Sequence, residues 1–172
     1  MNRQLFICLG CMFAPMSFCA LLGEDTEKAK TIEKQVAKAG LVMVAVMPRE
    51  TIAGSTANLK ITVKNNSDKG VEWLASPNNW GYQLSLLDSQ GESVPLTRFG
   101  RVAYGDARRV GPGYICRLVP GKETTDTLNI ARAFDLTREG EYSLTISLHL
   151  SSAEESIALQ IEKLRFKVIE EP

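Results

Sequence analysis

The chain has 172 residues and a mass of 18.9 kDa, which is the size of one ordinary domain with a tail. Lys and Arg number 20 and Asp and Glu also number 20, so the net charge is zero; this argues against a dedicated nucleic-acid-binding protein, which needs a basic excess to displace counterions from phosphates. Apolar residues make up 44% of the chain, enough for one hydrophobic core, which argues against global disorder.

Residues 1–20 have the layout of a secretory signal peptide. Arg3 supplies a positive start, an uncharged apolar run follows over 5–13, and small side chains precede a cleavage point before Ala20. The run is shorter than the roughly 20 apolar residues of a membrane span. We therefore expect export to the periplasm or the extracellular space, and no membrane span after cleavage.

Other interpretations of this segment stay open: an uncleaved anchor or a buried hairpin, and a lipoprotein signal. Lipidation is suggested by Cys8, Cys11 and Cys19, but Phe18 is the wrong residue before Cys19, and the apolar run before Cys11 is too short. If cleavage falls near residue 20, Cys116 is the single cysteine left. Such a chain has no internal disulfide partner in an oxidising compartment.

Residues 21–40 are expected to form a charged spacer. Four acids and four lysines occupy 24–39, and the apolar stripe among them is thin. Gly40 is a natural helix stop. The segment is either a short exposed helix or a solvated linker, and the folded domain is expected to cover 41–172.

From residue 41 the apolar period changes from about 3.6 to 2, which predicts strands. The run 41–47 is apolar throughout, as in a strand buried on both faces or at a sheet edge, whereas 57–65 alternates and predicts a half-buried antiparallel strand. The segment 65–70 is a dense turn signal. Further strands are expected at 71–74, 82–87, 94–96, 114–119, 125–130, 142–150, 156–161 and 164–169, with 98–113 irregular.

This pattern favours an all-β, antiparallel, immunoglobulin-like sandwich of about seven to nine strands, with no helix in the domain body. One-sided strands bury their apolar faces only against another sheet about 10 Å away. Short strands at regular spacing, separated by turn signals, are typical of sandwiches and barrels.

The segment 118–148 resembles the C-terminal half of secreted bacterial immunoglobulin-like domains. It has a Pro-Gly turn at 120–121, Phe-Asp-Leu at 134–136 and Gly-Glu-Tyr at 140–142. The fold type is similar to that of the bacterial intracellular proteinase inhibitors and of some metalloendopeptidase pro-regions. The resemblance implies that Tyr142 packs under the preceding corner with its hydroxyl bonded to main chain there, and that Leu136 enters the core.

A basic segment at 98–109 is the first candidate binding surface. It carries four arginines against one aspartate, with aromatic residues between them. Arginine pairs carboxylate and phosphate in bidentate fashion, so the segment suits an anionic glycan, a lipid head group or an acidic protein surface. The alternative is an exposed loop whose arginines pair with neighbouring acids. The candidate residues are Arg98, Arg101, Tyr104, Arg108 and Arg109.

A second candidate surface is the aromatic stretch 73–82. An exposed Trp80 beside asparagines suits stacking on a sugar ring. In the alternative interpretation, Trp73 belongs to the core and Trp80 covers the end of the sandwich.

Catalytic chemistry has little support in the residues. His149, the single histidine, falls on the polar face of its strand, so we expect it to be a surface residue. Cys116 has no histidine nearby in sequence to activate it, so we expect it to be a small buried hydrophobe. We expect no enzyme activity, no metal and no cofactor. The prediction is an exported, non-enzymatic binding or structural module with a protein or glycan partner; a secreted protease inhibitor and a minor hydrolase or hydrolase accessory domain are the alternatives.

Overall fold

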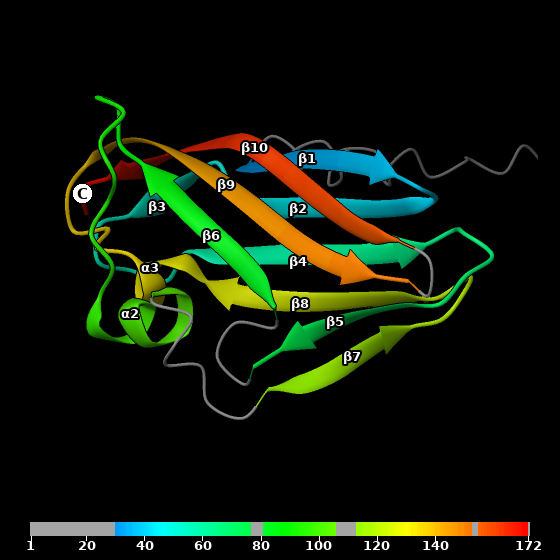
Figure 1. Ribbon diagram of the computed structural model, residues 1–172. Coiled ribbons are helices and arrows are strands. Elements are labelled where there is room, and N and C mark those ends of the chain that lie inside the picture. The colour runs from blue at the N-terminus through cyan, green and yellow to red at the C-terminus, as the bar shows by residue number, and fades with distance from the viewer. Residues whose placement is uncertain (1–29, 77–80, 106–112, 153–154, 172) are drawn as a thin grey trace, which may run out of the picture.

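The computed structural model describes residues 30–76, 81–105, 113–152 and 155–171, and these form a two-layer β-sandwich (Figure 1). The chain is an all-β protein with two short helices at one end of the sandwich. Its elements are β1 (Thr31–Lys38), β2 (Leu41–Pro48), β3 (Glu50–Ile52), β4 (Asn58–Asn65), β5 (Val71–Ala75), β6 (Tyr82–Leu87), α2 (Arg98–Tyr104), β7 (Tyr114–Leu118), β8 (Glu123–Asn129), α3 (Ile130–Ala133), β9 (Gly140–Ser151) and β10 (Ser156–Ile169).

The two sheets differ in size and in pairing. One has the order β1-β2-β4-β8 with antiparallel neighbours. The other has the order β3-β10-β9-β5-β7, and β6 also pairs with β9. The short strand β3 runs parallel to β10, whereas the remaining pairs are antiparallel. Because β9 pairs with β6 along one half and reaches β5 only at Ser151, a space opens between β5 and β6.

The core lies between the sheets and follows the alternation expected from the sequence. Strand β4 buries Leu59, Ile61 and Val63 completely, whereas Lys60 and Thr62 between them are exposed and half-buried. Strand β9 likewise buries alternate residues from Tyr142 to Leu150, and the residues between them are half-buried or exposed. Strand β2 departs from expectation, because its even-numbered valines are half-buried and only one face is fully covered. Each aliphatic side chain buried in this way stabilises the fold by about 1.5–3 kcal/mol.

The domain begins earlier in the chain than expected, because part of the predicted spacer is strand β1. Its residues pair in register with β2, from Thr31 opposite Pro48 to Lys38 opposite Leu41. Ile32 and Val36 lie four residues apart, a spacing that serves a helix face and a strand face equally well. The pairing with β2 decides between them, since it supplies the hydrogen bonds that a helix would otherwise make internally.

A two-residue turn at Ala39 and Gly40 joins β1 to β2, and both residues have positive φ angles, 51° and 75°. This is the main-chain geometry of a type I′ hairpin turn. Replacing Ala39 by glycine is expected to raise the free energy of unfolding by about 0.5–1 kcal/mol, because the alanine Cβ is strained in left-handed backbone and the added flexibility of the unfolded chain offsets part of the gain. The urea midpoint measures this. Ala37→Gly, within the strand, should lower the midpoint; an unchanged or lower midpoint for Ala39→Gly would contradict the prediction.

Three other local expectations were wrong. Residues 98–104 form helix α2 instead of an irregular loop, and 130–133 form helix α3. Residues 94–96 make no strand; one isolated bridge lies just before them at Ser93 and another at Leu96 within them. The last two predicted strands are one strand, β10, interrupted by a bulge between Ile161 and Leu164 where Lys163 has a φ of 55°.

The predicted signal segment 1–20 and the candidate residues Trp80, Arg108 and Arg109 lie outside the described residues. Among the residues that are described, no helix has the length and hydropathy needed to cross a membrane.

Candidate functional site

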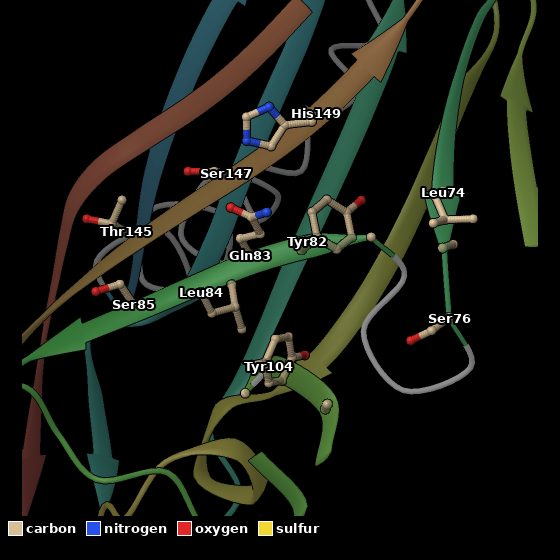
Figure 2. A pocket seen from close by; sticks show the side chains of 14 residues that line it. Leu74, Ser76, Tyr82, Gln83, Leu84, Ser85, Tyr104, Thr145, Ser147 and His149 are labelled. Atoms are coloured by element: carbon tan, nitrogen blue, oxygen red, sulfur yellow. The ribbon is translucent and has the colours of Figure 1, made fainter. Parts of the chain in front are cut away.

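A groove of about 580 Å³ lies between β5 and β6, and the end of α2 forms its third wall (Figure 2). We call it the β5–β6 groove. Figure 2 shows Gln83 of β6 with Ser147 and His149 of β9 along one part of it, and Leu84 with Tyr104 along another. Its volume is typical of ligand sites. The lining residues are Leu74, Ala75, Ser76, Gly81, Tyr82, Gln83, Leu84, Ser85, Ala103, Tyr104, Gly105, Thr145, Ser147 and His149.

The edge of β6 that faces away from β9 directs main-chain groups toward the groove. The carbonyl of Leu86 accepts a hydrogen bond from Val94 N at 3.0 Å, so the main chain of Leu86 points away from β9. Alternate residues of an antiparallel strand point the same way, which directs the amide and carbonyl of Leu84 into the groove. Among the described residues, none bonds to these two groups of Leu84.

Helix α2 is held in place from outside by α3. Thr97 caps α2, since its Oγ1 accepts from Gly100 N at 3.0 Å, and Thr97 N donates to the carbonyl of Ala133 at 3.0 Å. The guanidinium of Arg132 lies 4.0 Å from the centre of the Phe99 ring, a cation–π contact. These contacts position α2 so that Ala103 and Tyr104, at its C-terminal end, line the groove.

The first part of the basic segment that was predicted as a binding surface forms helix α2, and its residues point in different directions. Arg98 and Arg101 are exposed. Arg101 Nη1 donates to the carbonyl of Leu96 at 2.9 Å, so this guanidinium already makes a hydrogen bond within the domain. Tyr104 faces the groove and is half-buried. Of the candidate residues that are described, Tyr104 is the one in the groove. No sequence signal pointed to Leu84, because a free edge is a property of the sheet.

Burial raises the pKa of Tyr104 to about 12. In the unfolded chain its phenol ionises near 10, so its stabilising contribution is complete below pH 10 and is lost as the pH rises toward 12. Tyr104→Phe is therefore expected to reduce the alkaline loss of stability by up to about 1.4 kcal/mol per pH unit in that range. Urea denaturation at pH 7, 10 and 11 checks this. Equal stability at pH 7 is the control, and parallel alkaline slopes in the two proteins would contradict the expectation.

A hydrogen bond joins the two sheets close to the groove. The hydroxyl of the buried Tyr82 on β6 donates to Asp126 Oδ2 on β8 at 2.8 Å. Burial, and then Asp126, raise the pKa of Tyr82 well above its usual value. Cys116 is half-buried against the core, and burial and Asp126 raise the pKa of its thiol. A raised pKa disfavours the nucleophilic thiolate, in agreement with the expected role of a small hydrophobe.

The remaining residues that were singled out have structural positions. Trp73 and Leu136 are buried in the core. The Tyr142 hydroxyl donates to the carbonyl of Arg138 at 2.8 Å, which is the corner contact that the resemblance implied. His149 is exposed on the polar face of β9, as the alternation predicted. It lines the groove with Ser147, but within the described part of the chain no carboxylate lines this groove to orient it.

No protein-family model matches the chain, and no curated protein matches it. Solved structures similar to it include a PapD-like domain of human CEP192, at 14% identity and a TM-score of 0.43, with 99% of each chain covered. A β-glucosidase from Listeria innocua has 16% identity and a TM-score of 0.35, covering 77% of this chain and 16% of the enzyme. The putative ApaA protein from Bordetella pertussis has 11% identity and a TM-score of 0.33, with 81% and 89% covered. The relation to proteinase inhibitors stays a prediction.

Proposed function

We propose that this protein is a non-catalytic binding module that acts after export, and that it binds an extended segment of a partner polypeptide in the β5–β6 groove. The bound segment adds as a strand to the free edge of β6. The observation that carries the proposal is that the amide and carbonyl of Leu84 face a groove and have no hydrogen-bond partner among the described residues. The main chain of an extended peptide offers a donor and an acceptor at the spacing of a strand edge, which favours a polypeptide over a glycan.

The side chains around this edge indicate the kind of segment that fits. In the part of the chain that the structure describes, the groove lining contains no Asp, Glu, Lys or Arg. Ser85, Thr145 and Ser147 present hydroxyls, while Leu84 and Tyr104 present apolar surface. We therefore propose an uncharged segment in which apolar and hydroxyl side chains alternate.

The test uses an octapeptide of alternating valine and threonine as the probe, with binding followed by amide chemical shifts. A main-chain contact predicts that Leu84→Pro weakens binding at least tenfold, because the ring removes the outward N–H and obstructs the edge. Proline is tolerated on a strand where the N–H faces outward, so β6 should stay paired with β9.

Leu84→Ala is the matched control, since it trims the same side chain and keeps the main-chain donor. It should retain binding within a few-fold. Equal binding by the proline and alanine variants would refute strand addition, as would equal binding of an octapeptide with proline at its two central positions. Export is tested separately by fractionating cells that express the chain with and without residues 1–20.

A further inference from the structure

A second hollow of about 430 Å³ lies between edge strand β1 and the bulge of β10, and we call it the β1–β10 cleft. It shares no lining residue with the β5–β6 groove. Residues 31–34 of β1 form one wall, 163–165 of β10 form the other, and Arg49 closes the end.

A lysine on edge strand β1 links the two walls of the cleft. Lys34 lies opposite Ala45, a buried residue of β2, so its side chain points between the sheets. Its Nζ donates to the carbonyl of Glu162 at 2.9 Å. This carbonyl belongs to the bulge of β10, where Lys163 has a φ of 55°. The contact joins the edge of one sheet to the bulge of the other and sets the width of the cleft.

The lining is strongly positive although the whole chain is neutral. Lys34, Arg49, Lys163 and Arg165 contribute four positive charges and Glu33 one negative charge, for a net charge of plus three. Among the described residues, none forms a salt bridge with these four cations. The carboxylate of neighbouring Glu162 accepts a hydrogen bond from Gln160 Nε2 at 3.1 Å.

An excess of like charge gathered in a concave site attracts a ligand of opposite charge. Two of the four are arginines, whose planar guanidinium binds two oxygens of one group. A single carboxylate would leave most of the positive charge uncompensated, whereas a phosphate group carries about two negative charges near neutral pH. We propose that the β1–β10 cleft binds a phosphate group carried by a small molecule or a lipid headgroup.

Inorganic pyrophosphate is the probe for a soluble ligand, with binding measured by calorimetry at 0.15 M salt. The double variant Arg49→Gln/Arg165→Gln is expected to weaken binding at least tenfold. Lys60→Gln/Lys64→Gln is the matched control: it removes the same charge from exposed positions of β4 outside the cleft, and should change binding less than twofold. Exposed substitutions of this kind leave stability almost unchanged, which thermal denaturation of both variants verifies.

Vesicles of phosphatidylcholine with phosphatidic acid distinguish the two sources. If the protein binds these vesicles, and the cleft variant abolishes that binding while the control variant keeps it, the ligand is a lipid headgroup. Pyrophosphate binding with the same dependence, and no vesicle binding, assigns a soluble phosphate compound. Equal weakening by both double variants would overturn the proposal, because it would show diffuse surface charge. The absence of saturable binding to either probe would overturn it as well.

Discussion

Replacing Gly100 by alanine is expected to lower the free energy of unfolding by about 3 kcal/mol. A Cβ at this position would lie 1.9 Å from the carbonyl oxygen of Ala133 and 2.8 Å from its carbonyl carbon. Both neighbours are main-chain atoms, so relief requires α2 and α3 to separate. Separation would also break the hydrogen bond from Thr97 N to the same carbonyl.

Thermal denaturation measures this effect, and 3 kcal/mol corresponds to a fall of roughly 6–12 °C in the midpoint for a chain of this size. Gly70→Ala is the control, because its Cβ would meet nothing closer than Arg117 Nε at 3.7 Å. The control should leave the midpoint within about 2 °C. If the thermal midpoint of Gly100→Ala equals that of the unsubstituted protein, the two helices are not in contact in solution. Since α2 walls the β5–β6 groove, the same variant should weaken octapeptide binding.

The second large effect is expected at Asn65, the last residue of β4, which is fully buried. Its Nδ2 donates to the carbonyls of Lys69 at 2.8 Å and Leu118 at 3.0 Å. Its Oδ1 accepts from Ser67 N at 3.0 Å and from Ser67 Oγ at 2.6 Å. One amide therefore supports the turn after β4 and ties it to the end of β7 in the opposite sheet.

Asn65→Ala is expected to lower the free energy of unfolding by about 3 kcal/mol, because it leaves buried partners, including the carbonyl of Leu118, without a hydrogen bond. Urea denaturation measures the loss. Asn66→Ala is the matched control: this neighbour is exposed, and its main-chain bond to Gly40 does not involve the side chain, so a change within about 0.5 kcal/mol is expected. Similar losses for the two variants would mean that the buried amide contributes little.

Asn65 also shows how far sequence reasoning reached. The run from Asn65 to Gly70 predicted a turn, and a turn lies there. The alternation of the preceding strand places Asn65 on its apolar face. The hydrogen bonds of its amide could not be predicted, because one partner is the carbonyl of Leu118, 53 residues away in sequence. The alternation within β4 and β9 predicted the buried face of each strand correctly, since a strand's two faces are set by its own residues.

The errors have one physical origin. The spacing of Ile32 and Val36 fits a helix and a strand, and pairing with β2 selects the strand. The glycines in 98–113 suggested an irregular loop, yet α2 forms because Thr97 caps it and α3 supports it. In both segments the local preference is weak, and contacts with distant residues decide the outcome.

The sequence by itself determined the fold class, the position of most strands and the residues of the core, because period-2 alternation of apolar side chains is a local property that burial between two sheets enforces. Only the tertiary structure decided where a sheet edge stays unpaired and which charges share a cleft. Among the described residues, Leu84 has no main-chain partner on its outer side because β5 pairs with β9 only at Glu72 and Ser151. The four cations line one cleft because β1 lies against the bulge of β10. Both arrangements depend on strand order, which joins residues far apart in the chain.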